Sequence, residues 1–152
     1  SVTGASDVIG QTEGTLFLDF NEDGNTNYSI ARALSISDGT YNNRVYLSRL
    51  SSGAIYVAGS VGGSSVIELQ EPTPSSRTRV KAALAYSNND YVLYVNGVQK
   101  ATDTSAGVPT CSNIYLGQEI GLTTNSLKKP YNEVILFKER LSNAELATLT
   151  TL

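Results

Sequence analysis

Short runs of alternating apolar and polar residues recur along the chain, separated by turn residues. The first run, at 14–20, places Leu16 and Leu18 on one face and Phe17 and Asp19 on the other. Alternation with a period of two is typical of a β-strand whose two faces meet different surroundings. Turn residues return about every 8–12 residues, which is the spacing of an all-β sandwich.

Further extended runs are predicted at 28–37, 43–50, 53–59, 66–69, 79–86, 91–95, 98–104, 113–116 and 133–137. The run 91–95 is apolar throughout, so we expect a central strand that is covered on both faces. Asn96-Gly97, which follows it, is the strongest signal in the chain for a type I′ hairpin turn. Pro72 and Pro74 exclude a central strand or a helix from their segment.

One helix is predicted, at the end of the chain. Residues 142–145 (SNAE) fit a capping box, in which Ser142 caps the helix and Glu145 reaches back. Leu141 and Leu146 occupy the two positions that pin such a helix to the body of a domain. No repeat or low-complexity tract divides the chain, so we expect a single domain over residues 1–152. Because the sequence contains no Met, we expect a piece of a longer protein, with residues 1–9 as a linker.

The composition favours strands and turns and argues against several functions. Ser, Thr and Asn occupy 45 of the 152 positions, and a net charge of −3 without a basic cluster argues against nucleic-acid binding. The absence of His excludes the usual catalytic triads and zinc sites. The single cysteine, Cys111, excludes an intrachain disulfide and is expected to be buried. No apolar run approaches the ~20 residues of a membrane span, so we expect no membrane insertion.

Three segments stand out for their order along the chain. They are GTLFLDF at 14–20, RVKAALAYSNNDYVLYVNGVQKAT at 79–102, and IYLGQE at 114–119 followed by YNEVILFKERLSNAELATL at 131–149. Together they resemble the laminin-G-like branch of the concanavalin A-like lectin/glucanase superfamily. The resemblance implies an all-β fold, an antiparallel β-sandwich (concanavalin A-like jelly roll) with one short C-terminal helix. It also implies a module that binds carbohydrate or protein.

Two positions depart from the pattern of that superfamily. Asn132 stands where an aspartate is common, and Ile135 stands where an outward polar or basic residue is common. An exposed Ile on an outer strand indicates a surface that another chain covers. The alternative is a strand that is buried on both faces.

The glucanases of this superfamily carry an E-x-D-x-x-E pattern, which places paired carboxylates on one face of a strand. This chain contains no E-x-D, and its acidic residues are scattered. Since a His base is also absent, the sequence predicts a module that is not an enzyme.

One acidic segment matches the first half of a calcium loop. Residues 19–24 read D-x-N-x-D-G, which makes Asp19, Asn21 and Asp23 candidate calcium ligands. The twelfth position is Ile30 and not Glu, so the segment is not an EF-hand. A hairpin loop built from turn residues explains the same pattern without a metal. No other cofactor is expected.

Two loops combine an aromatic ring with the polar groups that sugar recognition needs. Their candidate residues are Tyr41, Asn42, Asn43 and Arg44 in the first loop and Asn125, Lys128 and Tyr131 in the second. Cationic residues in both loops of a net-acidic domain favour an anionic glycan. For each loop, the alternative is an ordinary solvated loop. If neither binds, the next candidate is the concave sheet with Tyr46, Tyr94 and Tyr115.

The resemblance, the absence of Met and the composition together predict a non-catalytic module that binds cell-surface carbohydrate. We expect the receptor-binding tip of a bacteriophage tail fibre or tailspike, located in the virion tail. Such tips are homotrimers, so we also expect a homotrimer. One alternative is the carbohydrate-binding module of a secreted bacterial glycoside hydrolase, and another is a trimerisation or capping domain without a ligand.

Overall fold

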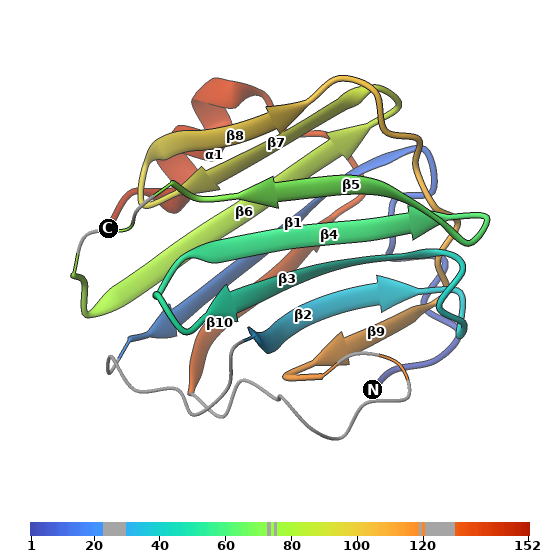
Figure 1. The fold of residues 1–152 in the computed structure, drawn as a ribbon, viewed down its shortest axis with the longest axis horizontal. Coiled ribbons are helices and arrows are strands. Elements are labelled where there is room, and N and C mark those ends of the chain that lie inside the picture. Colours follow the sequence, from blue (N-terminus) through green and yellow to red (C-terminus); the bar gives the residue numbers. More distant parts are fainter. Residues whose placement is uncertain (23–29, 73, 75, 119, 121–129) are drawn as a thin grey trace.

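The computed structural model describes residues 1–22, 30–72, 74, 76–118, 120 and 130–152. Within these residues, the chain forms two five-stranded antiparallel sheets that face each other (Figure 1). The order of the first sheet is β10 (Tyr131–Phe137), β1 (Glu13–Asn21), β6 (Arg79–Ser87), β7 (Asp90–Val95) and β8 (Val98–Asp103). The order of the second sheet is β5 (Ser64–Gln70), β4 (Ile55–Val61), β3 (Arg44–Leu50), β2 (Ile30–Ser37) and β9 (Asn113–Leu116). The predicted jelly-roll sandwich is therefore confirmed.

The alternation along each strand decides which side chains fill the space between the sheets. Leu16 and Leu18 of β1 point into this core, together with Leu47 of β3 from the opposite sheet. Phe17, which lies between the two leucines, points to the outer face of the first sheet. Cys111 is buried in the core, as predicted.

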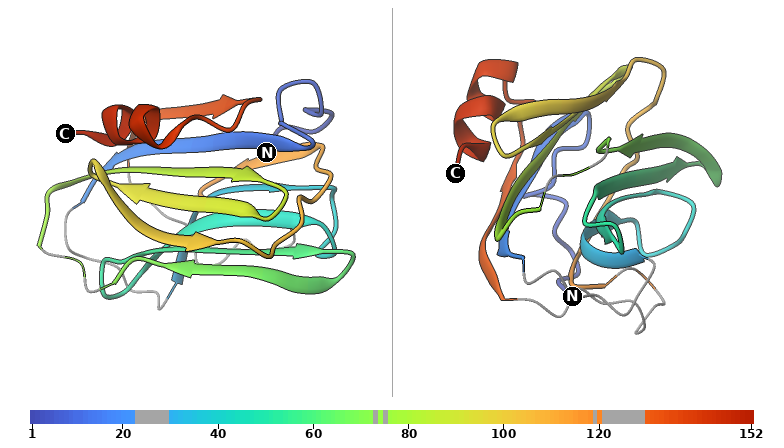
Figure 2. Two further views of the ribbon diagram at one scale, coloured as in Figure 1. Left: turned by 90° about the horizontal axis from the view of Figure 1, so that it is seen from above. Right: turned by 60° about the vertical axis from the view of Figure 1, so that its left-hand side comes forward.

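A short helix, α1 (Asn143–Thr150), covers that outer face (Figure 2). The capping box is present, because the Ser142 side chain accepts from the Glu145 backbone and the Glu145 carboxylate accepts from the Ser142 backbone N–H at 2.8 Å. Leu146 of the helix packs on Phe17 and Val92, so β7 is covered on both faces as predicted. No helix in the described part of the chain is long and apolar enough to cross a membrane.

The same apolar layer explains the unusual Ile135. This residue pairs with Phe17 in the register of β10 and β1, and it is half-buried against the cluster beneath the helix. Its apolar character is therefore accounted for within one chain. Ile135 therefore does not indicate that a second chain covers this surface.

The N-terminal segment is part of the sandwich, which corrects the expectation of a linker over residues 1–9. Val2 and Ile114 exchange two backbone hydrogen bonds of 2.9 Å at the edge of the second sheet. Ala5 and Ile9 are buried in the core. Apolar side chains at these two positions hold the segment against the domain.

The predicted hairpin turn between β7 and β8 is also confirmed. Asn96 and Gly97 have φ angles of 49° and 80°, and two consecutive positive values are what a type I′ turn requires. The Asn96 side chain accepts from the Lys81 backbone at 2.8 Å and so ties the turn to β6.

Candidate functional site

The first predicted loop follows β2 and is held by an aspartate. The Asp38 carboxylate accepts from the backbone and the hydroxyl of Thr40, both at 2.7 Å, and from the Asn43 amide at 2.9 Å. Burial raises the pKa of Asp38, but the hydrogen bonds from Asn43 and Thr40 outweigh this effect and lower it below the ordinary value. Gly39 supplies the positive φ of 94° that the turn needs.

This loop is tied to the β4–β5 turn. The backbone N–H of Gly62 donates to the Asn43 side chain, and that of Gly63 donates to the Asn42 carbonyl, both at 3.0 Å. Both ends of the Asn43 amide are thus engaged, one donating to the Asp38 carboxylate and one accepting from the Gly62 backbone, and we do not retain it as a ligand-contacting group. The Asn42 side chain is on the exposed part of the loop.

An arginine lies against two tyrosine rings where the loop joins β3. The guanidinium carbon of Arg44 is 4.8 Å from the centroid of the Tyr41 ring and 5.4 Å from that of Tyr46. Tyr41 is 47% exposed, whereas Tyr46 is buried and packs at 6.4 Å from Tyr56. We call the group Tyr41, Asn42 and Arg44 the Tyr41 surface. It offers an exposed aromatic ring, an amide and a planar cation, which are the groups that a sugar acid needs.

The strand register places the Tyr41 surface beside the outer face of the second sheet. Tyr115, Ser35, Tyr46 and Ala58 stand next to one another in a row across β9, β2, β3 and β4. Tyr94 does not belong to this face, because it lies on the first sheet beneath the helix, where its hydroxyl bonds Gln99. The expected grouping of Tyr46, Tyr94 and Tyr115 on one sheet is therefore corrected.

The second predicted loop does not add to the Tyr41 surface. Asn125 and Lys128 lie outside the described residues. Tyr131 begins β10 and packs against the core, where its hydroxyl donates to the Ala33 carbonyl at 2.7 Å. Burial raises the pKa of Tyr131 to about 12. Its ring is partly buried against the core, so we leave Tyr131 out of the Tyr41 surface.

Two of the three candidate calcium ligands lie on β1, and Asp23 lies outside the described residues. Arg79 holds the Asp19 carboxylate with Nε at 2.9 Å and with Nη2. Asn132 donates to Asp19 at 3.0 Å and to Asn21 at 3.1 Å. The hydrogen bond from Arg79 is the main reason that the pKa of Asp19 is lowered. In the part of the chain that the structure describes, no three acidic, Cys or His side chains group as a metal site.

This arrangement favours Asn over Asp at position 132. An aspartate there would place a second carboxylate against Asp19, whereas the amide of Asn132 donates a hydrogen bond to it. The guanidinium of Arg79 binds the Asp19 carboxylate, which is the same group that would coordinate a calcium ion. Calcium binding to Asp19, Asn21 and Asp23 stays a prediction of the sequence, and a competing cation is already present in the fold.

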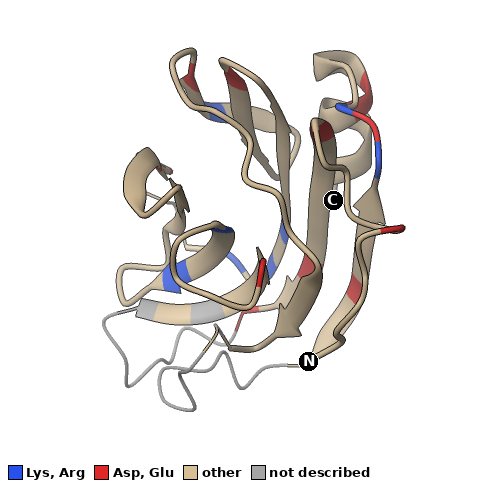
Figure 3. Cartoon of the chain, turned by 90° about the vertical axis from the view of Figure 1, so that its right-hand side faces the viewer, with Lys and Arg blue, Asp and Glu red and all other residues tan. Residues whose placement is uncertain are grey.

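Charged positions of both signs are interspersed over the two sheets (Figure 3).

The contact between Arg44 and Tyr46 could be predicted from the sequence, because the two residues are two positions apart on one strand and so share a face. The return of Tyr41 onto Arg44 depends on the Asp38 turn, which local periodicity does not describe.

Comparison with known proteins gives no match to any family model and none to the sequence of a curated protein. Solved structures do match. The CBM40 domain of the Ruminococcus gnavus IT-sialidase is 21% identical with a TM-score of 0.71, over 96% of this chain and 86% of that chain. The same domain has been solved with α2,3-sialyllactose, and it then gives a TM-score of 0.72.

Two further structures come from larger chains. The NanB sialidase of Streptococcus pneumoniae is 18% identical with a TM-score of 0.78, over 97% of this chain and 26% of that chain. Domains LG4-5 of the mouse laminin alpha1 chain are 16% identical with a TM-score of 0.64, over 88% and 37%. At these identities the likeness shows the fold alone. The fold is a jelly-roll β-sandwich like that of these CBM40 and laminin domains, which agrees with the fold that the sequence resemblance implies.

Proposed function

We propose that this chain is a non-catalytic recognition module that binds a glycan with a carboxylate group through the Tyr41 surface. The observation that carries the proposal is the Arg44 guanidinium placed against an exposed Tyr41 ring. An exposed tyrosine ring packs on the C–H face of a sugar, and a guanidinium matches a carboxylate with two parallel N–H groups. Asn42 adds an amide that both donates to and accepts from hydroxyl groups.

The rigidity of the surface supports a binding role. Arg44 starts β3, and the loop before it is fixed by the hydrogen bonds of Asp38 and Asn43. Loops that a rigid sheet positions are frequent sites of recognition. Since the ring and the cation are already in place, little conformational entropy is lost when a ligand binds.

The solved neighbours support a glycan as the ligand. Two of them are CBM40 domains bound to α2,3- and α2,6-sialyllactose. Sialyllactose carries a carboxylate, which agrees with the chemistry of the Tyr41 surface. The same neighbours are binding modules and not catalytic domains, and this agrees with a chain that lacks His and the E-x-D-x-x-E pattern.

The setting that these neighbours favour is a binding module attached to an extracellular bacterial enzyme. The expected phage tail tip has no support among the neighbours reported above. The expected homotrimer has also lost its argument from Ile135. A light-scattering mass near 48.6 kDa, three times the 16.2 kDa of one chain, would restore the trimer, and a mass of 16.2 kDa would exclude it.

The experiment that tests the function is a glycan array with matched acidic and neutral members. We expect the chain to retain glycans with a terminal or internal carboxylate and to release their methyl esters and neutral analogues. Weak retention is expected, because each sugar hydrogen bond contributes only about 0.5–1.5 kcal/mol, so the array is best probed with a multivalent form. Equal retention of acids and methyl esters would contradict the role given to Arg44.

A further inference from the structure

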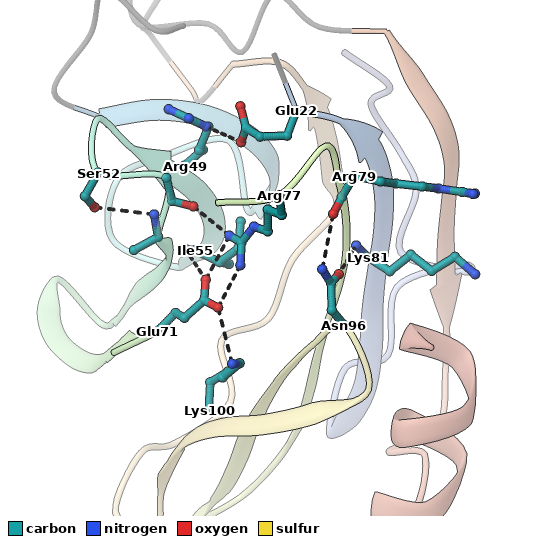
Figure 4. Close-up of polar contacts among 12 residues, drawn as sticks. Glu22, Arg49, Ser52, Ile55, Glu71, Arg77, Arg79, Lys81, Asn96 and Lys100 are labelled. Atoms are coloured by element: carbon teal, nitrogen blue, oxygen red, sulfur yellow. Dashed lines mark hydrogen bonds and ion pairs between the residues drawn. The ribbon is translucent and has the colours of Figure 1, made fainter. Parts of the chain in front are cut away.

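Two ion pairs, both drawn in Figure 4, join the sheets near the β3–β4 turn, at the other end of β3 from the Tyr41 surface. Glu22, directly after β1 of the first sheet, accepts from Nε of Arg49 on β3 of the second sheet. Glu71, directly after β5 of the second sheet, accepts from both Nη atoms of Arg77, at 2.7 and 2.9 Å. Arg77 leads into β6 of the first sheet. All four side chains are at most 10% exposed.

A pocket of about 320 Å³ opens beside these pairs. Its walls are formed by Glu22, Arg49, Arg77, the β3–β4 turn at 51–53, Pro74 and Ser76. The pocket follows the end of β3, whereas the Tyr41 surface lies at its start. Since a strand rises about 3.3 Å per residue, the seven residues of β3 separate the two places by about 20 Å.

One arginine donor beside the pocket has no acceptor among the residues that the structure describes. Arg49 donates Nε to Glu22 and Nη1 to the Leu50 carbonyl at 2.9 Å. Among the described residues, none accepts a hydrogen bond from its Nη2. The Arg49 side chain is only 3% exposed, so this donor has little access to bulk water. Nε of Arg77 is likewise buried without a partner in the described part of the chain.

Gly53 leaves this donor open to the pocket. Its φ of +88° is in the left-handed region, and a Cβ there would lie 3.7 Å from Nη2 of Arg49 and 3.8 Å from Cγ of Pro74. A side chain at this position would therefore stand between the cation and the proline ring. With glycine, no side chain of residue 53 occupies that space.

The charges around the pocket favour an anion. The charged lining of the pocket consists of two cations, Arg49 and Arg77, and one carboxylate, Glu22. Glu71, which is not part of the lining, accepts from Arg77 and lies 3.5 Å from Lys100. Buried ion pairs can often be replaced by apolar residues without loss of stability. The two buried ion pairs beside this pocket are therefore poorly explained by their contribution to the stability of the fold.

We infer that this pocket is a second binding site, and that its ligand is a small sugar acid. Nη2 of Arg49 donates to the ligand carboxylate, the hydroxyls of Ser51, Ser52 and Ser76 bond the ring hydroxyls, and Pro74 packs on the sugar C–H groups. A volume of about 320 Å³ is at the small end of the range for ligand pockets and suits one sugar ring. The site does not depend on the Tyr41 surface.

The test is a titration of the isotope-labelled chain with sodium glucuronate, followed by amide chemical shifts. Glucose and sodium acetate are titrated in parallel as the sugar without a charge and the charge without a sugar. We expect glucuronate to shift the amides of residues 51–53 in a saturable manner, at least tenfold more tightly than glucose or acetate. Tyr41→Ala should leave this binding unchanged, which separates this site from the proposed function.

Gly53→Asn is the variant that fills the pocket. Asn tolerates a positive φ better than other side chains, so the turn is retained while the amide occupies the space beside Arg49. Gly4→Asn is the matched control, because Gly4 has a φ of +69° and no atom within 4 Å of a Cβ. We expect Gly53→Asn to weaken glucuronate binding at least tenfold and Gly4→Asn to leave it unchanged.

Three results would overturn the inference. They are the absence of saturable shifts at residues 51–53, equal binding of acetate or glucose, and unchanged glucuronate binding in Gly53→Asn. Equal weakening by Gly4→Asn would assign the effect to the substitution itself and would also count against the site.

Discussion

Arg44 and Tyr41 form a cation–π contact at the rim of the second sheet, with the guanidinium carbon 4.8 Å from the ring centroid. Such contacts contribute about 0.5–1 kcal/mol at exposed sites. The same guanidinium carbon is 5.4 Å from the centroid of the Tyr46 ring, so a second ring also restricts the orientation of the cation. In the proposed function, this orientation places the cation and the ring in advance for an acidic sugar.

Arg44→Lys separates the charge of the cation from its planar shape. Lysine keeps the positive charge but loses the two parallel N–H groups and the stacking on Tyr41. We expect the affinity for an acidic glycan to fall about tenfold, or about 1.4 kcal/mol, with no change in neutral-sugar binding. Isothermal titration measures both. Unchanged affinity for the acid would show that charge alone is sufficient.

Glu71→Gln tests the ion pair that joins the two sheets. Glu71 is 1% exposed and accepts from Arg77 and from the Ile55 backbone. The amide leaves Arg77 buried without a counter-charge, and we expect a loss of about 3–5 kcal/mol in the free energy of unfolding. Urea denaturation gives this value. Glu68→Gln, on the exposed face of the same strand, should change stability by less than about 0.5 kcal/mol.

Asp19 should make stability depend on pH in the acid range. The Arg79 hydrogen bond lowers the pKa of Asp19 below its ordinary value of 3.8. A lowered folded-state pKa stabilises the fold above the unfolded-state pKa, and this contribution is lost as the pH falls through the folded-state pKa. We therefore expect Asp19→Asn to lower Tm at neutral pH, with the difference from the parent shrinking below pH 3.8.

Melting curves from neutral to strongly acidic pH test this prediction. Asp7→Asn serves as the control, because Asp7 is exposed. A difference between Asp19→Asn and the parent that stays constant through the acid range would rule out titration of Asp19 as the cause.

Much of the fold was open to prediction because its signals are local. The alternation at 79–86, the Asn96-Gly97 turn and the capping box at Ser142 each depend on residues that are close in the sequence, and each is found as predicted. The helix-covered outer layer was harder to predict. Phe17 and Ile135 carry no local sign that a helix lies over them.

The candidate sites were predicted less well, because their groups meet across long separations. Asp19 and Asn132 are 113 residues apart, and their bond changes the meaning of the calcium-like segment. Arg49 and Glu22 come from different sheets. The pattern of residues along a single strand cannot predict an ion pair between two sheets. The packing of Tyr131 against the core was not predicted for a related reason, since its neighbours in the sequence are typical of a loop.

Cys111 should be chemically silent in the folded chain. Burial raises the pKa of its thiol to about 12, so the reactive thiolate is scarce at neutral pH. We expect no reaction with an aromatic disulfide reagent in buffer and one equivalent of reaction in denaturant. Rapid reaction of the native chain would show that the core around Cys111 opens readily.

The most direct test of the account is the affinity of Tyr41 variants for the acidic glycan that the array retains most strongly. Tyr41→Phe keeps the ring, Tyr41→Ala removes it, and Val98→Ala alters an exposed residue of β8 on the other sheet. Isothermal titration should show about tenfold weaker binding for Tyr41→Ala, with Tyr41→Phe and Val98→Ala within about twofold of the parent. Equal affinity of Tyr41→Ala and the parent would contradict the proposed binding surface.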